Sequence, residues 1–462
     1  MKYVWACACS GSLVVLLWGC AVQPTPLPQV DVPPHWNATS APGAAVTSEW
    51  FRGFGSQELD ELIATAYRNN WDLQAAAARV RQADARARAA GAALLPDVTA
   101  GANAASYAGH SSSGTVHETD YAALLSASYE LDFWGKGRAA RLSARAQREG
   151  SESDKAVVAL STVTGVANTY FQVVATRERV EFAKQTLANA QRLLEVVEAR
   201  RAVNLSNPVE VAQQRGVVAA TQVHLREVEQ QEAEQEAALA ILTGKVPGAF
   251  SVAADHLADF TPPRVAPGLP AELLTRRPDL ASAEASLQAA HGDVLQARAA
   301  FFPAVTLTGS VGLANPAVAA AVATLTGTGP TSTLGVEVVQ SIFNGGRLRA
   351  VRDEALGRED EMVAQYRKVV LESLWDVEVA LSAIERLNDQ ESAQLLGVEQ
   401  GKQALAGAQA RYQAGSGDFL VVLDAQRSLV TVQEQLSQYR LARLQAAVGL
   451  CKALGGGWVQ EH

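Results

Sequence analysis

Two halves of this 462-residue sequence repeat one another, so the fold must contain one structural unit twice. Three landmarks pair in the same order: Leu94–Thr99 with Phe301–Thr306 at an offset of 207 residues, Asp132–Arg138 with Ser341–Arg347 at 209, and Ala199–Pro208 with Ala410–Phe419 at 211. We interpret this order and near-constant spacing as a tandem duplication of a helix, strand, strand, long helix, turn, helix unit. The predicted first repeat covers 49–246, a proline-rich join covers 247–270, and the second repeat covers 271–462.

Very long helices are expected within each repeat. Beyond the N-terminal region, prolines cluster between Pro247 and Pro278, and the stretches 97–207, 209–246 and 331–462 contain no helix breaker. These stretches are rich in residues that favour helices, such as Ala, Leu, Glu, Gln and Arg. As one helix at ~1.5 Å per residue, the segment from Arg138 to Arg200 would span roughly 95 Å.

Two stretches in each repeat alternate between apolar and polar residues, which predicts strands with one apolar face. The second repeat alternates over 305–313 and 334–342, and the first over 121–132, preceded by a weaker strand near 98–107. Segments of about ten residues have the length of a tilted membrane strand. The Gly/Ser/Thr-rich stretches 108–119 and 314–333 are expected to be loops between them. Alternation alone also fits a soluble amphipathic sheet.

Four strands cannot close a barrel, and every backbone polar group in lipid must be paired. Several chains would therefore contribute strands to one barrel. Two chains give eight strands, whose interior is filled with side chains, whereas three chains give twelve and can leave a passage.

The N-terminus has the pattern of a secretory signal that ends in a lipid-attachment cysteine. Lys2 precedes a short apolar core, and Leu17-Trp18-Gly19-Cys20 ends it, with Leu17 and Gly19 fitting a lipobox and Trp18 departing from it. We expect residues 1–19 to be the signal peptide, Cys20 to carry lipid, and the proline-rich segment 20–48 to be an extended tether. An ordinary signal peptide is the alternative. Cys451, alone on a predicted helix, is expected to be a buried apolar residue.

Composition excludes several other classes of protein. The 39 Lys and Arg against 48 Asp and Glu give a net charge of −9, which argues against a nucleic-acid groove. No run of 18 apolar residues occurs beyond the N-terminus, so no membrane-spanning helix is expected there. The seven histidines are scattered and are expected to be solvated, and no phosphate loop or nucleophile motif is present. We therefore expect no enzyme activity, no cofactor and no metal site.

The ordered motifs resemble those of the outer-membrane factors of the TolC and OprM type, and in particular their lipoprotein branch. The resemblance rests on seven segments that cover nearly the whole chain: Trp50–Phe54, Glu58–Ile63, Tyr129–Gly135, Arg277–Leu280, Ser341–Arg347, Leu423–Leu429 and Lys452–Trp458. It implies a mainly α fold with a membrane β-barrel: a homotrimer with a twelve-stranded barrel in the outer membrane, a long periplasmic α-helical barrel and an equatorial region that holds the join. The implied function is the passive exit duct of a tripartite efflux system for drugs or other small toxic compounds. Its implied partners are a periplasmic adaptor (membrane fusion) protein and an inner-membrane exporter of the resistance-nodulation-division or fusaric-acid type.

The same resemblance places a periplasmic gate at the helix turns 201–208 and 412–419. It implies a ring of three Leu420 side chains and a ring of three Asp424 carboxylates, four residues apart and so on one helix face. It also places Arg411 and Tyr412 among the links that join neighbouring helices. Gly417 and Val421 depart from relatives that have Arg and Asp at these positions. Ordinary packing of Leu420 and solvation of Asp424 are the alternatives. For the whole chain, the alternative is a periplasmic lipoprotein scaffold, a coiled-coil adaptor that does not span the membrane.

Overall fold

The computed structural model describes residues 27–459, except for 38–42, 112–113, 249–250 and 315–330. The expected signal peptide and Cys20 lie outside the described residues. The first repeat supplies η2 (Trp50–Phe54), α1 (Gln57–Asn69), α2 (Trp71–Ala92), β1 (Asp97–Ser111), β2 (Gly114–Glu130), α3 (Lys136–Ala202) and α4 (Pro208–Leu242). The join contains η3 (Leu257–Asp259) and η4 (Pro270–Glu272). The second repeat supplies α5 (Leu273–Arg276), α6 (Pro278–Ala299), β3 (Ala304–Ala314), β4 (Thr331–Val339), α8 (Arg347–Gln413), α9 (Phe419–Ala453) and η5 (Gly455–Gly457).

The chain divides into two compact units, and each contains parts of both repeats. One unit includes 79–152 and 282–367, with all four strands, and the other includes 30–78, 153–281 and 368–462. The duplication in sequence therefore does not produce two independent bodies, because each unit is completed by segments from both repeats.

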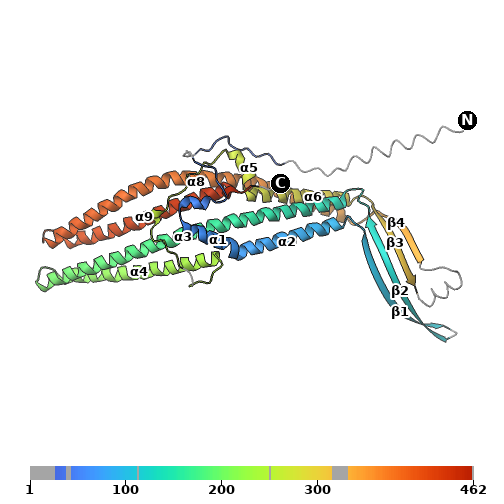
Figure 1. Cartoon of the computed structure of the whole chain (residues 1–462), viewed down its shortest axis with the longest axis horizontal. Helices are drawn as coiled ribbons and strands as arrows, with labels where there is room; N and C mark the ends of the chain where they lie inside the picture. Colours follow the sequence, from blue (N-terminus) through green and yellow to red (C-terminus); the bar gives the residue numbers. More distant parts are fainter. Residues whose placement is uncertain (1–26, 38–42, 112–113, 249–250, 315–330, 460–462) are drawn as a thin grey trace. The chain divides into compact units, whose positions relative to one another are not determined.

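The four strands form one antiparallel sheet in the order β1-β2-β3-β4 (Figure 1). Over most of β2, β3 and β4, residues that face each other across the strands share polarity, although Val311 lies opposite Ser332. Apolar residues oppose apolar residues, as in the pairs Tyr129–Leu307, Leu307–Val336 and Val305–Val338. Polar residues oppose polar residues, as in Thr99–Ser126, Ser126–Ser310 and Ser310–Thr333. Hydroxyl hydrogen bonds join Thr99 to Ser126 at 3.0 Å and Ser310 to Thr333 at 2.5 Å on the polar face. The sheet therefore has one apolar and one hydroxyl-rich face.

The expected loop at 108–119 is wrong. Strand β1 continues to Ser111 and β2 begins at Gly114, with Ala108 opposite His117 in the same register as the rest of the hairpin. This segment contains the β-branched residues Thr115, Val116 and Thr119, which favour strands, and the register of the hairpin extends through it to Ser111 opposite Gly114. The hairpin strands are thus 15 and 17 residues long, longer than the ten expected. Of the second expected loop, 314–333, the structure describes only the ends, which belong to β3 and β4.

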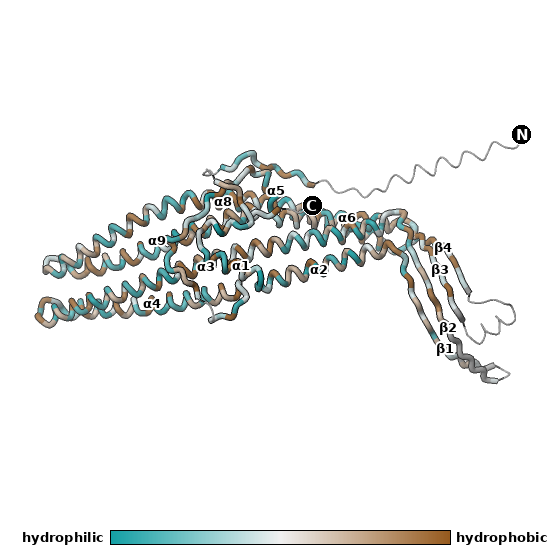
Figure 2. Tube along the Cα trace, in the orientation of Figure 1, coloured by the Kyte–Doolittle hydropathy of each residue, from teal (hydrophilic) through white to brown (hydrophobic). Residues whose placement is uncertain are grey.

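Two antiparallel hairpins of long helices, α3 with α4 and α8 with α9, dominate Figure 1. Helices α3 and α8 each have 67 residues, which corresponds to about 100 Å at the ordinary helical rise. Asp132 begins α3, because its carboxylate accepts hydrogen bonds from the backbone nitrogens of Gly137 at 3.0 Å and Arg138 at 2.9 Å. Figure 2 shows hydrophilic and apolar residues interleaved along these helices, as expected where narrow stripes are buried.

The largest core lies in the unit that contains the N-terminal helices. Trp50, Phe54, Tyr170, Phe171 and Phe260 pack there edge to face or tilted, with ring centroids 5.0–6.2 Å apart. Cys451 is fully buried in the same cluster, as predicted, and burial raises the pKa of its thiol to about 12. Among the described helices, α3 is the one that is long and apolar enough to cross a membrane by length and composition, with an 18-residue window of mean hydropathy 1.3. Half of that window is buried within the chain.

Candidate functional site

The two helix turns, 203–207 and 414–418, have the same local design. Asn204 and Gly415, which are 211 residues apart, both adopt left-handed backbone angles, with φ of 61° and 77°. The backbone nitrogen of Leu205 donates to the Arg200 oxygen at 2.8 Å, and that of Ser416 donates to the Arg411 oxygen at 3.0 Å. Such bonds satisfy the last carbonyl groups of α3 and α8.

The following helices begin on equivalent side chains. Asn207 accepts a 2.9 Å hydrogen bond from the backbone nitrogen of Glu210, and Asp418 accepts one of the same length from Leu420. Gly417 leaves no room for a side chain, because a Cβ there would lie 2.9 Å from the backbone nitrogen of Tyr412 and 3.0 Å from the Cβ of Arg411. The close backbone packing of this turn therefore favours glycine at position 417 over the arginine that some relatives have there.

Tyr412 joins the two hairpins next to these turns. Its side chain is buried, and its Oη donates a 2.8 Å hydrogen bond to Oε2 of Glu210 on α4. The Arg200 guanidinium lies over its ring, 4.7 Å from the centroid, and the ring packs against Phe419 at 5.2 Å. Burial and the bond to Glu210 raise the pKa of Tyr412, so the phenol stays protonated and remains a donor.

The arginine in this contact is Arg200, the counterpart of Arg411 in the first repeat. Arg200 Nη1 also donates to the backbone oxygen of Gln413 at 3.2 Å, so it binds two consecutive residues of α8. The Arg411 side chain is exposed and forms no ion pair among the residues that the structure describes. Arg411 contributes through its backbone oxygen, which closes the second turn. Sequence reasoning identified Tyr412 and Arg411 but missed Arg200 and Glu210, and only the repeat could have suggested Arg200.

Leu420 and Asp424 lie one turn apart on α9, and both are exposed in the single chain. Leu420 is 57% exposed, as is Val421 beside it. Their neighbours Val422 and Leu423 are buried in a cluster with Leu193, Val197 and Tyr412. The buried residues of α9 thus anchor the helix, and Leu420 and Asp424 lie on its uncovered side.

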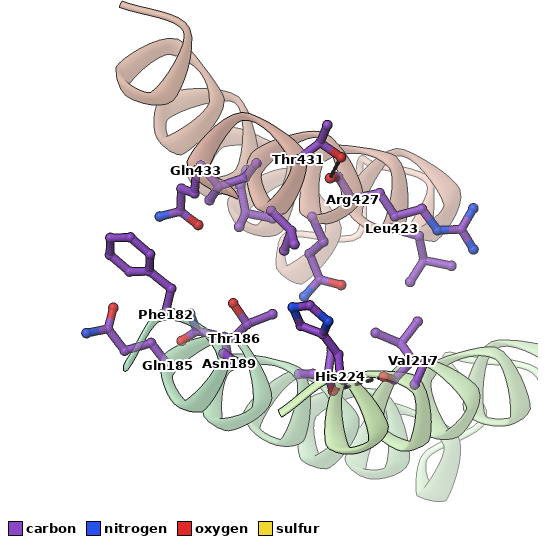
Figure 3. A pocket seen from close by; sticks show the side chains of 18 of the residues that line it. Phe182, Gln185, Thr186, Asn189, Val217, His224, Leu423, Arg427, Thr431 and Gln433 are labelled. Carbon is purple, nitrogen blue, oxygen red and sulfur yellow. Dashed lines mark hydrogen bonds between the residues drawn. The ribbon is translucent and has the colours of Figure 1, made fainter. Parts of the chain in front are cut away.

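A groove of about 1070 Å³ lies between the two hairpins. Figure 3 shows Phe182 and Asn189 of α3 on one side, with Val217 and His224 of α4, facing Leu423 and Arg427 of α9. Leu420 and Asp424 also line it. The lining combines apolar side chains with amides, hydroxyls and charges.

His224 bridges this groove. Its Nε2 lies 2.7 Å from Oε1 of Glu434 on α9, and its Nδ1 lies 3.9 Å from Glu227 on its own helix. In the other unit, His291 of α6 pairs with Glu359 of α8 at 2.8 Å. The expectation that the histidines are simply solvated is therefore wrong for these two, because each meets a carboxylate on a helix distant in sequence. Among the described residues, no group of three or more His, Cys, Asp or Glu side chains could hold a metal ion.

Comparison with known proteins identifies the relatives of this arrangement. The sequence profile of the outer membrane efflux protein family matches residues 62–245 and 269–456, one match in each repeat. The chain is 42% identical to the pyoverdine export outer membrane protein OpmQ of Pseudomonas aeruginosa, over 98% of this chain and 97% of that one. It is 30% identical to the cation efflux system protein CusC of Escherichia coli, over 96% and 98% of the two chains.

A solved structure shares the whole fold. The crystal structure of CusC, with 28% sequence identity, superposes with a TM-score of 0.82 over 95% of this chain and 100% of that chain. The helix hairpins, the four-stranded sheet and the internal repeat are therefore those of a trimeric outer-membrane channel. With both repeats matched by one family profile, the chain belongs to the outer membrane efflux protein family.

Proposed function

We propose that this chain is the passive exit duct of a tripartite exporter, working as a homotrimer in the outer membrane and extending into the periplasm. The observation that carries the proposal is the four-stranded sheet, which has one apolar face, one hydroxyl-rich face and, among the described strands, open edges at β1 and β4. Three such sheets supply twelve strands, enough to enclose a water-filled passage. The apolar face would contact lipid and the hydroxyl-rich face would line the lumen.

Apolar side chains at all four junctions between strands and helices support a membrane position for the sheet. Exposed residues of this kind precede or follow each strand: Leu95 before β1, Phe133 and Trp134 after β2, Phe302 before β3, and Ile342 and Phe343 after β4. Trp134 stacks on Phe302 at 4.8 Å and donates a 2.7 Å hydrogen bond from its indole to the Pro303 oxygen. Aromatic residues of this kind gather where a membrane protein meets the lipid headgroups.

The helix turns support a gate at the periplasmic end. The proposed gate consists of Leu420 and Asp424, exposed on α9 and available to the same residues of two other protomers. The Tyr412–Glu210 bond and the Arg200–Tyr412 contact hold the two hairpins of one protomer together. Tyr412 is therefore a proposed link at the gate through its side chain. Arg411 is a proposed link in the trimer, and within this chain its backbone oxygen closes the second turn.

We assign the N-terminal segment to membrane anchoring: residues 1–19 as signal peptide, Cys20 as the lipidated residue and 20–48 as tether. Acyl chains contribute ~0.8 kcal/mol per buried CH₂, enough to retain a chain at the bilayer when two or three are attached. Cys20→Ser should abolish labelling by a fatty-acid probe, and persistent labelling would refute the assignment. Partial function should survive, because the barrel has a much larger contact with lipid.

The cargo we propose is a secreted compound of the pyoverdine type, since the identity to the pyoverdine export protein is 42% and that to the cation efflux protein is 30%. A periplasmic adaptor and an inner-membrane exporter of the resistance-nodulation-division or fusaric-acid type would deliver it. Deletion of the gene should lower the secreted compound and retain it in the periplasm, as measured by mass spectrometry of both fractions. Sensitivity to copper, dyes or aromatic acids without that retention would reassign the cargo.

Fractionation with semi-native electrophoresis tests the duct itself. A trimer that requires detergent and sediments with the outer membrane is expected. A soluble monomer in the periplasmic fraction would instead support the coiled-coil scaffold, in which the apolar strand face packs on protein.

A further inference from the structure

Each edge of the sheet lacks a partner strand within the part of the chain that the structure describes. Strand β1 pairs only with β2, and β4 only with β3, among the strands that the structure describes. A strand inside a bilayer cannot leave its backbone hydrogen-bonding groups unpaired, because each costs several kcal/mol there. In the trimeric duct, on which this inference rests, the partner of β4 is β1 of the neighbouring protomer. The register of that pairing decides which residues meet across the subunit boundary.

The internal repeat supplies a template for that register. At the β2–β3 pairing, the first repeat meets the second within one chain, and at the β4–β1 pairing the second repeat would meet the first across two chains. The ends of the strands correspond closely: β1 and β3 begin at Asp97 and Ala304, 207 residues apart. Strands β2 and β4 end at Glu130 and Val339, 209 residues apart. These are the offsets that the sequence landmarks show.

Transferring the observed pairing gives a definite register. Glu130 of β2 lies opposite Thr306 of β3. The counterpart of Glu130 in the second repeat is Val339, 209 residues later, and the counterpart of Thr306 in the first repeat is Thr99, 207 residues earlier. The transferred pairing therefore places Val339 opposite Thr99. We propose that β4 of each protomer pairs with β1 of the next so that Val339 opposes Thr99 and Glu337 opposes Gly101. The last residue of β4 then meets the third residue of β1, as the last residue of β2 meets the third of β3.

The faces of the sheet support this register. Val336 would oppose Ala102 of the neighbouring protomer, and both residues lie on the apolar face. Val336 is on this face because it opposes Leu307. Ala102 is on it because it opposes Ala123, which lies two residues from Leu125 on the same side of β2. A slip of one residue would turn Val336 to the hydroxyl-rich face of the neighbour, next to Asn103 or Gly101. Only even slips keep one continuous apolar band around the barrel.

A slip of two residues is the competing register. The two hairpins within the chain already differ from each other by two residues. In the first, Asp97 opposes Ser128, and the equivalent pair in the second would be Ala304 with Glu337. The structure instead pairs Ala304 with Val339. The test must therefore resolve a shift of two residues. Opposed residues have Cβ atoms ~4.5–5.5 Å apart and residues displaced by two ~7–8 Å, a difference that disulfide formation can detect.

The pair Glu337 and Gly101 is the sharpest probe. The backbone nitrogen of Leu131 donates a 2.8 Å hydrogen bond to the Val305 oxygen, so Glu130 and Thr306 form the closer, non-hydrogen-bonded type of pair. The transferred pair Val339–Thr99 has the same type. Because the two types alternate along the strands, the Glu337–Gly101 pair, two residues further along, has it too. A Cβ at Gly101 meets nothing within 4 Å in its own chain, so a cysteine fits there. The native Cys451 is fully buried and does not compete for oxidant.

The experiment uses the full-length protein in outer membranes. Glu337→Cys with Gly101→Cys, oxidised with copper-phenanthroline, should give covalent dimers and trimers on denaturing gels, at least fivefold more than either single variant. Glu337→Cys with Thr99→Cys and Glu337→Cys with Asn103→Cys report the two slipped registers. Stronger cross-linking by either slipped pair overturns the proposed register. No cross-linking by any pair, while semi-native gels still show the trimer, overturns the edge pairing as assigned. Loss of the trimer in the wild-type protein would overturn the duct instead.

Discussion

Tyr412 of α8 and Glu210 of α4, which are 202 residues apart in sequence, are joined by a 2.8 Å hydrogen bond from Oη to Oε2. Glu210 also accepts from the Ser206 hydroxyl at 2.6 Å and the Asn207 amide at 3.2 Å, so its carboxylate is fixed by its own turn. The bond therefore connects one rigid turn to the other hairpin. Movement of α8 and α9 away from α3 and α4 must break it.

Removing this bond is the first prediction. Tyr412→Phe keeps the ring against Phe419 and Arg200 but deletes a bond to a charged acceptor, of the class that contributes ~1.5–3 kcal/mol. We expect a higher single-channel conductance in planar bilayers with an unchanged yield of trimer. Thr431→Val is the matched control, because its hydroxyl donates to the backbone oxygen of Arg427 within the same helix, α9. Equal conductance of Tyr412→Phe and wild type would remove this bond from the gate.

The repeat alone could not predict this link. Arg200 and Arg411 occupy equivalent positions, and the sequence gives no reason to prefer one of them. The second repeat has Tyr412 where the first has Arg201, and this difference supplies the ring over which Arg200 of the first repeat lies. Similarly, the pairing of His224 with Glu434 depends on how α4 and α9 face each other, which periodicity does not determine.

Helix extents and strand faces were predictable because they follow from local chemistry. Left-handed Asn204 and Gly415 end the long helices, and Asn207 and Asp418 begin the next ones, so each boundary is encoded within a few residues. The extended β1–β2 hairpin was not predictable in the same way. Glycine, serine and threonine suit loops and hydroxyl-rich strands alike, and only pairing with the opposite strand decides between them.

The second prediction concerns the apolar face of the sheet. Leu307 and Val336 oppose each other on it, and Thr308 lies on the other face. Leu307→Arg should lower the yield of trimer, because arginine on a lipid-facing strand costs ~2–4 kcal/mol near the bilayer midplane. Thr308→Arg, one residue away, should be much milder. Semi-native electrophoresis of both variants at matched expression measures the difference. Equal tolerance of arginine on both faces would contradict a membrane sheet.

The third prediction concerns a buried carboxylate on α3. The Glu178 side chain is 5% exposed, 3.4 Å from Arg440, and burial raises the pKa of Glu178 above its usual value although Arg440 partly opposes this. The folded protein then binds more protons than the unfolded chain between the ordinary pKa and the raised one. Its free energy of unfolding should therefore fall as pH rises through that window.

Glu178→Gln should remove this dependence. We expect the melting temperature of the purified trimer, followed by circular dichroism, to fall less between pH 4 and pH 7 in Glu178→Gln than in the wild type. Glu181→Gln, an exposed residue on the same helix, should leave the slope unchanged. Parallel curves for wild type and Glu178→Gln would show that another group governs the pH dependence.

The fourth prediction concerns the gate. In the proposed trimer, three Leu420 side chains meet near the axis and exclude water, and three Asp424 carboxylates repel one another unless cations or neighbouring arginines offset them. Leu420 is 57% exposed within its own chain, so its truncation should leave folding intact. Its buried neighbour Val422 is different, since it belongs to the cluster that holds α9 in place.

Leu420→Ala, alone or with Asp424→Ala, should therefore raise single-channel conductance and sensitise cells to large antibiotics such as vancomycin, with no loss of trimer. Val209→Ala is the matched control: Val209 is the counterpart of Leu420 in the first repeat and is 61% exposed. Conductance in the Val209 variant should stay near that of the wild type if the constriction is made by α9. If instead Val209→Ala opens the duct and the Leu420/Asp424 double variant does not, the gate lies on α4 at the first turn.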